Sequence, residues 1–212
     1  MKRHYLFSFL LFVCGCVLHN SIKPEDRWGS LPSFKYGEMI GKTYNNVFKN
    51  LNDQKLNFYC DPQWNTTQIY VPGFIYYSGI TLNDENRSVL VQYINKYFEW
   101  NKLAIKENTT LEKEIGRINV PLNWRANNSD EWYRGDVDIT VGFFSQNAGR
   151  HQLTIAFSEA KASVNYYITN KLETIYLDKN DVDKLSNLLS IEVIKKEVEK
   201  QNAKATTEAK FK

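Results

Sequence analysis

Residues 135–144 read GDVDITVGFF, and apolar and polar side chains alternate along this stretch. Val137, Ile139 and Val141 fall on one side of an extended chain. Asp138 and Thr140 fall on the other side. Such a period of two is typical of a strand with one buried and one wet face. It therefore predicts an antiparallel sheet in this part of the chain.

The same pattern continues downstream. After a turn at residues 146–150, residues 152–157 alternate again. Two shorter apolar runs follow at residues 164–168 and 172–177, with residues 169–171 between them. Short alternating runs joined by tight turns predict a β-meander.

Two helices are expected to cover the apolar face of this meander. Residues 84–106 carry an apolar stripe at helical spacing, and Thr81 or Asn83 can cap the helix. A second helix is expected at residues 181–200, with Asn180 as its cap. Because each helix has one apolar stripe, both should pack on the face that carries Val137.

The first half of the chain gives more scattered patterns. Residues 34–57 have apolar side chains at helical spacing and predict a short amphipathic helix. Residues 68–78 predict a strand that is interrupted at Pro72-Gly73. Residues 109–120 predict a polar strand that the following proline ends, and residues 124–134 predict a loop.

Together these elements predict one folded domain between two polar ends. Residues 34–200 are expected to form a single α+β domain, an antiparallel meander of about four to six strands with two or three helices on one face. Residues 16–33 contain Pro, Gly and Ser amid polar residues and predict a flexible tether. Residues 201–212 predict a polar tail that frays.

The N-terminus has the anatomy of a secretory signal peptide, with a basic head, a short apolar stretch and small residues. The apolar stretch, residues 5–13, is shorter than the ~20 residues that span a bilayer. It ends in Val13-Cys14-Gly15-Cys16, which resembles the lipobox of bacterial lipoproteins. In that class, the final cysteine is diacylated on sulfur and becomes the new N-terminus. The resemblance implies that residues 1–15 are removed and that Cys16 carries the lipid.

Lipidation at Cys16 implies a location in the cell envelope. Two or three acyl chains anchor a protein stably, whereas one chain binds a membrane only marginally. Val17 follows the cysteine, in place of the Asp that retains some lipoproteins in the inner membrane of diderm bacteria. The resemblance therefore favours the outer membrane in a host that has one.

Charge and cysteine content argue against several classes of function. Lys and Arg number 27 against 24 acidic residues, and they are spread rather than clustered, so nucleic-acid binding is not expected. Once Cys14 is removed and Cys16 is acylated, Cys60 has no disulfide partner and is expected to be buried. His151 is expected at a turn edge, and no cofactor or metal site is predicted.

Carboxylates near residue 136 suggest an alternative function. Asp136-Val137-Asp138 resembles the aspartate pair of haloacid-dehalogenase-type phosphatases, which ends an apolar strand. Here the strand comes after the pair, which predicts a solvent-exposed row instead. Likewise, residues 37–43 resemble a phosphate-binding loop that is one residue short, and Gly41 is expected to be a turn residue. An exported hydrolase that uses carboxylates among Glu131, Asp136 and Asp138 is the alternative.

Aromatic residues provide the predicted binding site. Phe144 and Tyr167 fall on the polar side of their strands, so they should be exposed neighbours on the open face, together with Gln152. Trp124 and Trp132 lie in the predicted loop and could form a platform for a sugar or a peptide. Because no catalytic set converges, we expect a non-enzymatic binding or assembly module. Its expected partner is an envelope protein or a glycan.

Overall fold

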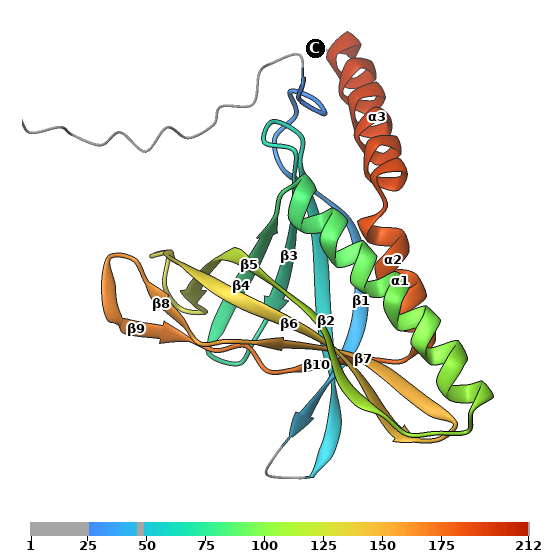
Figure 1. The fold of residues 1–212 in the computed structure, drawn as a ribbon. Coiled ribbons are helices and arrows are strands. Elements are labelled where there is room, and N and C mark those ends of the chain that lie inside the picture. The colour runs from blue at the N-terminus through green and yellow to red at the C-terminus, as the bar shows by residue number, and fades with distance from the viewer. Residues whose placement is uncertain (1–25, 46–48, 212) are drawn as a thin grey trace, which may run out of the picture.

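The computed structural model describes residues 26–45 and 49–211, and it has a mixed α+β fold built around a closed barrel (Figure 1). Eight antiparallel strands close in the order β1-β10-β7-β6-β5-β4-β3-β2, while β8 and β9 form a separate two-stranded sheet. The strands are β1 (Phe34–Asn45), β2 (Asn50–Asp61), β3 (Thr66–Pro72), β4 (Tyr76–Leu82), β5 (Glu112–Ala126), β6 (Tyr133–Asn147), β7 (Arg150–Phe157), β8 (Ala160–Ala162), β9 (Asn165–Asn170) and β10 (Ile175–Leu177). The helices are α1 (Asp84–Lys106), α2 (Lys179–Leu189) and α3 (Ile191–Glu208), followed by a 3-10 turn at Ala209–Phe211. The predicted signal peptide and Cys16 lie outside the described residues.

The predicted α+β class is confirmed, with more strands than expected. β6 has the alternation read from the sequence, since Val137, Ile139 and Val141 are buried while Asp136 and Asp138 are exposed. β1 pairs with β2 along one edge and with β10 along the other, and this second pairing closes the sheet into a barrel. Closure leaves the barrel strands without a free edge.

Helix α1 has the predicted bounds. Its N-terminus is capped by Asn83, whose Oδ1 accepts a hydrogen bond from the Asn86 backbone N–H at 2.8 Å. The apolar stripe packs on the barrel, where the ring of Tyr97 lies 5.7 Å from that of Phe143. The Tyr97 hydroxyl also donates a hydrogen bond to the His151 carbonyl at 2.9 Å. α1 therefore covers the face that carries Val137, as expected.

The helix predicted at residues 34–57 is wrong, because this segment forms the hairpin of β1 and β2. The inward positions of β1 include Gly37 and Gly41, where side chains of the core leave no room. A Cβ on Gly37 would lie 2.4 Å from Leu188 Cδ2, and one on Gly41 would lie 2.6 Å from Ile175 Cγ2. A bulge between Lys35 and Gly37 also shifts the register. Glycines and a bulge thus hide the period of two that marks a strand.

Strand β5 continues through the proline that was expected to end it. Pro121 pairs with Asp136 of β6, but the pairing between β5 and β4 ends at Leu122. Proline has no backbone N–H to donate, but no carbonyl of β4 lies opposite Pro121 to need one. Because β5 extends to Ala126, the predicted loop at residues 124–134 shrinks to residues 127–132. Trp124 lies inside the barrel as a result.

The last strands do not form the predicted end of the meander. β9 pairs with β8, and β10 instead pairs with β7 and β1. β8 crosses close to β6 where Gly135 stands, since a Cβ there would lie 2.2 Å from the Lys161 carbonyl oxygen. The Ser163 backbone N–H donates a hydrogen bond to the Arg134 carbonyl at 2.8 Å and fixes this crossing. The sequence pattern indicated β9 and β10, but it indicated neither β8 nor the strands with which these elements pair.

The predicted helix at residues 181–200 is two helices. Ser190 is extended (φ −66°, ψ 132°) and separates α2 from α3. Asp178, rather than Asn180, occupies the cap position of α2. The predicted polar tail is helical, because α3 continues to Glu208 and projects away from the barrel (Figure 1).

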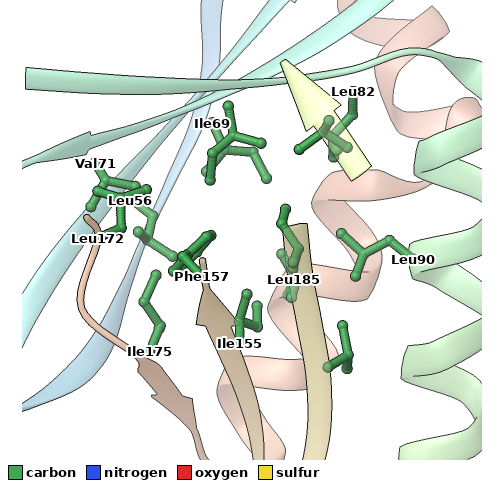
Figure 2. Close-up of a cluster of buried hydrophobic side chains, with 14 of the residues drawn as sticks. Leu56, Ile69, Val71, Leu82, Leu90, Ile155, Phe157, Leu172, Ile175 and Leu185 are labelled. Atoms are coloured by element: carbon green, nitrogen blue, oxygen red, sulfur yellow. The ribbon is translucent and has the colours of Figure 1, made fainter. Parts of the chain in front are cut away.

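The helices and the barrel share one apolar core. Figure 2 shows Leu90 of α1 and Leu185 of α2 pointing into the same cluster as Leu82 and Ile155 of the barrel. A smaller second cluster joins Cys60 of β2 to the α3 side chains Ile194 and Val198. It attaches α3 to the end of the barrel at which Cys60 lies.

Part of the predicted tether is fixed to the fold. Asn65, in the turn between β2 and β3, has a left-handed backbone conformation with φ of 51°. Its Oδ1 accepts from the Trp28 backbone N–H at 2.7 Å, and its Nδ2 donates to the Asp26 carbonyl at 2.7 Å. The Gly29 N–H also donates to the Pro62 carbonyl at 3.3 Å. The chain from Asp26 onward is thus held at the β2–β3 end of the barrel.

Candidate binding surface

The predicted pair of Phe144 and Tyr167 is wrong. Phe144 lies on β6 of the barrel, half-buried, with its ring edge-to-face to Tyr176 at 6.1 Å. Tyr167 is 96 % exposed, but it lies on β9, which is paired with β8 and not with a barrel strand. Gln152, expected on the same open face, is buried and donates a hydrogen bond to Asp178 Oδ1 at 2.8 Å. The error follows from the strand pairing, because Tyr167 belongs to a different sheet.

The two predicted loop tryptophans have different environments. Trp124 is completely buried in the barrel and cannot contact a ligand there. Trp132 is 46 % exposed in the loop between β5 and β6. It is therefore the one predicted platform residue that combines exposure with aromatic neighbours.

Four aromatic side chains form a cluster on the outer face of the barrel, which we call the aromatic cluster. Its members are Tyr59, Tyr70, Tyr77 and Trp132, from β2, β3, β4 and the β5–β6 loop. The rings of Tyr70 and Tyr77 are stacked at 5.0 Å, and Tyr59 meets Tyr70 edge-to-face at 5.2 Å. Trp132 stands edge-on to Tyr70 and Tyr77, at 6.4 and 6.3 Å. Such offset and edge-to-face pairs are the preferred aromatic geometries.

Gly79 explains how Tyr70 lies on the sheet. The two residues are paired directly across β3 and β4. A Cβ on Gly79 would lie only 2.5 Å from Tyr70 Cε1, so the ring occupies the space that a side chain would fill. Burial raises the pKa of Tyr70, and the neighbouring Tyr59 and Asp61 raise it further. Its hydroxyl donates a hydrogen bond to Gln68 Oε1 at 3.0 Å.

Arg125 holds the loop that carries Trp132. Its guanidinium lies over the rings of Trp132 and Tyr77, at 5.5 and 5.9 Å from their centroids. Its Nη1 also donates to the Ser129 carbonyl at 2.7 Å. These contacts fix the loop against the aromatic cluster.

A groove of about 440 Å³ lies beside the aromatic cluster, and we call it the polar groove. It runs from the β2–β3 turn across β3, β4 and β5. Its lining includes Trp64, Gln68, Thr81, Asn86, Asn123 and Arg134. The hydrogen bond from Tyr70 to Gln68 joins this groove to the aromatic cluster.

The carboxylates of the alternative function do not converge. Asp136 and Asp138 are exposed on the outer face of β6, and Asp138 Oδ1 accepts a hydrogen bond from Asn119 at 2.7 Å. Glu131 lies in the preceding loop and accepts from the Tyr133 hydroxyl at 2.9 Å. The phosphate-loop-like residues 37–43 lie within β1 and form no loop.

The remaining nucleophile and base candidates are buried. Cys60 is inaccessible, and burial raises the pKa of its thiol to about 12. His151 is only 4 % exposed, with its Nδ1 2.8 Å from Ser145 Oγ. Among residues 26–45 and 49–211, no group of three or more His, Cys, Asp or Glu side chains is arranged to hold a metal ion.

No helix within residues 26–45 and 49–211 has the length and apolarity needed to cross a membrane. Comparisons with protein-family models, with curated proteins and with solved structures found no match.

Sequence reasoning found Trp132 but missed Trp64 and the three tyrosines of the aromatic cluster. The tyrosines come from three strands and meet only through the register of β2, β3 and β4. One signal was present in the sequence. Gln68 and Tyr70 share the parity of Thr66, so an aromatic residue stands on the polar side of a strand.

Proposed function

We propose that this chain is a lipid-anchored protein of the bacterial cell envelope whose barrel domain is a non-enzymatic binding module. Its partner is an envelope protein or a glycan, and its anchor is the lipid on Cys16. The observation that carries the binding role is the aromatic cluster, which presents Trp132 and three tyrosines on the outer face of the barrel. Exposed Trp and Tyr side chains are enriched at recognition surfaces because they combine a large apolar area with a polar edge.

The distribution of carboxylates favours binding over hydrolysis. Acid and base roles require two carboxylates in different surroundings within reach of one bond. Asp136 and Asp138 instead stand side by side on an exposed strand face, and Glu131 is engaged with Tyr133. This arrangement of carboxylates supports a binding role rather than a hydrolytic one.

The anchor follows from the resemblance of Val13-Cys14-Gly15-Cys16 to a lipobox. In a host with two membranes, Val17 after the lipidated cysteine favours the outer membrane. The barrel needs no membrane affinity of its own, because the acyl chains supply the attachment.

Metabolic labelling with a clickable palmitate analogue tests the anchor. The wild-type chain should take up the label and fractionate with membranes, whereas Cys16→Ala should do neither. Cys60→Ala is the matched control, because it removes the other cysteine beyond the signal peptide and should keep the label. Label that persists in Cys16→Ala would rule out lipidation at this residue.

A pull-down from native envelopes tests the binding role. Trp132→Ala should reduce capture of the partner, because it removes the most exposed ring of the aromatic cluster. Leu103→Ala removes a similarly exposed side chain from α1, which contributes no residue to the cluster, and should leave capture unchanged. Equal capture by both variants would contradict a role for the cluster.

A further inference from the structure

The aromatic cluster and the polar groove form one continuous surface across the outer face of the barrel. Tyr70 of β3 pairs with Gly79 of β4, Gly79 pairs with Asn123 of β5, and Asn123 pairs with Arg134 of β6. These positions therefore form one row across four strands. Gly79 has no side chain, and the Tyr70 ring lies over it, which brings Tyr70 toward Asn123 across the sheet.

The polar groove is lined by several side chains that can form hydrogen bonds. Within residues 26–45 and 49–211, the side chains of Thr81, Asn123 and Arg134 make no hydrogen bond or ion pair with one another or with the rest of the fold. Gln68 uses its Oε1 for Tyr70, which leaves its Nε2 available. A ligand that offers several donors and acceptors in a row could satisfy these groups together.

An aromatic side chain stands at each end of this surface. Trp64, in the β2–β3 turn, is 47 % exposed at one end of the groove. Tyr70 and Trp132 stand at the other end. Along β3 the distance from Thr66, beside Trp64, to Tyr70 is four residues, or roughly 13 Å. The surface is thus elongated, with flat rings at both ends and amides between them.

The charge and backbone of this surface restrict its ligand. Asp61 and Arg134 contribute one charge of each sign to the groove lining, and Arg125 beside the aromatic cluster is paired with Asp130 at 3.8 Å. No strong field therefore favours a polyanion or a polycation. β3, β4 and β5 are each hydrogen-bonded on both sides, so no strand edge is open to an added peptide strand. The ligand should therefore be uncharged, elongated and rich in hydroxyl groups.

We propose that the polar groove and the aromatic cluster together bind a segment of an uncharged glycan chain. A sugar ring has apolar C–H faces that stack on Trp or Tyr, and equatorial hydroxyls that bond to amides. Trp64 and Trp132 hold the two ends of the bound segment, while Gln68 and Asn123 bond to hydroxyls between them. This proposal rests on the binding role proposed above and identifies the class of partner.

Affinity electrophoresis with the full chain in detergent tests the proposal. The protein is run through native gels that contain soluble β-glucan, α-mannan or galactan, and it is titrated with chitohexaose by calorimetry. Wild type should bind at least one of these four probes. Trp64→Ala, Trp132→Ala and Asn123→Ala should each weaken that binding by about tenfold or more. Between ~0.05 and ~0.5 M salt, the affinity should stay within about twofold, because the ligand is uncharged.

Two control variants match the chemistry of the changes but lie elsewhere. Tyr167→Ala removes an aromatic ring that is 96 % exposed on β9, and Asn95→Ala removes an exposed amide from α1. Both should keep wild-type affinity, and near-UV circular dichroism should be the same for all variants.

Failure to bind any of the four probes would overturn the glycan proposal, as would binding that Trp64→Ala and Asn123→Ala both retain. Capture of an envelope protein that depends on the groove residues, without glycan binding, would also overturn it. That last result would leave the binding role intact. Palmitate labelling is independent of these outcomes, so a failure of the anchor is seen separately.

Discussion

Arg87 illustrates how a single buried cation connects separate elements. It is only 7 % exposed, although it belongs to the first turn of α1. Its Nη1 donates to the Leu189 carbonyl at the end of α2 at 2.9 Å, and its Nη2 lies 2.5 Å from Asp84 Oδ1. Its guanidinium also lies over the ring of Trp28 at 5.7 Å. One side chain thus joins the N-terminal segment, α1 and the junction of α2 with α3.

Replacing Arg87 by methionine should therefore destabilise the fold. The change keeps much of the buried volume but leaves the Leu189 carbonyl without its charged donor, at a cost of about 2 kcal/mol. Arg117→Met is the control, because Arg117 pairs with Glu114 on the surface, where solvent screens the pair and its loss should change stability little. Urea unfolding followed by tryptophan fluorescence measures both variants. An equal loss of unfolding free energy in the two variants would show that the buried contacts of Arg87 add nothing to stability.

Cys60 should be unreactive while the chain is folded. Burial raises the pKa of its thiol to about 12, so the folded state holds the neutral thiol across the alkaline range in which an exposed cysteine ionises. The thiolate is the reactive form, and the thiol itself is inaccessible. Iodoacetamide at about pH 9 should therefore modify Cys60 only after denaturant is added. Rapid modification of the native protein, measured by mass spectrometry, would contradict this environment.

At the scale of the element, the sequence pattern predicted a strand or helix correctly where an apolar side chain stands at every position that faces the core. α1 has the expected bounds because a large apolar residue recurs on each turn and Asn83 caps its start. β1 failed because Gly37 and Gly41 replace apolar residues on its inner face. The break at Ser190 was also hidden, because the apolar spacing continues across it from α2 to α3.

The candidate site could be predicted from the sequence only as far as the strand pairing could. Alternation gave the correct face for β6 and β7, but nothing in the pattern told which strand β9 would join. The site prediction for Phe144 and Tyr167 depended on that pairing and failed with it. The tyrosines of the aromatic cluster were missed for the same reason, since only the register of β2, β3 and β4 brings them together.

The β8–β9 hairpin depends on close packing at Gly135. A methyl group there would lie 2.2 Å from the Lys161 carbonyl oxygen, which is backbone and cannot rotate away. Gly135→Ala should therefore separate β8 from β6 and lower the free energy of unfolding by about 1–3 kcal/mol. Limited proteolysis should then cut first within the hairpin.

Gly149→Ala is the matched control for this change. A Cβ at that position meets only Asn147 Oδ1, at 3.6 Å, so stability should change by about 0.5 kcal/mol or less. A hairpin that stays resistant to protease in Gly135→Ala would mean that β8 tolerates the displacement.

At the scale of the molecule, two cores are joined at one end of the barrel. The main core fills the barrel and its contact with α1 and α2, while the smaller core holds α3 against Cys60. Residues 26–30 are bonded to the β2–β3 turn at this same end. The described chain therefore begins beside α3 and the β2–β3 turn, which carries Trp64.

The smaller core predicts where the chain can be shortened. Of the residues that the structure describes, ending the chain at Ala205 removes only exposed side chains of α3 and the turn after it. The thermal midpoint should therefore fall by less than about 2 °C. Ending it at Ser190 removes Ile194 and Val198 and uncovers Cys60, which should cost about 4 kcal/mol. It should also expose the thiol, so the shorter variant should react with iodoacetamide without denaturant. Differential scanning calorimetry and the alkylation assay measure the two effects on the same samples. If the two truncations had similar midpoints and equal thiol protection, α3 would not stabilise the barrel through this cluster.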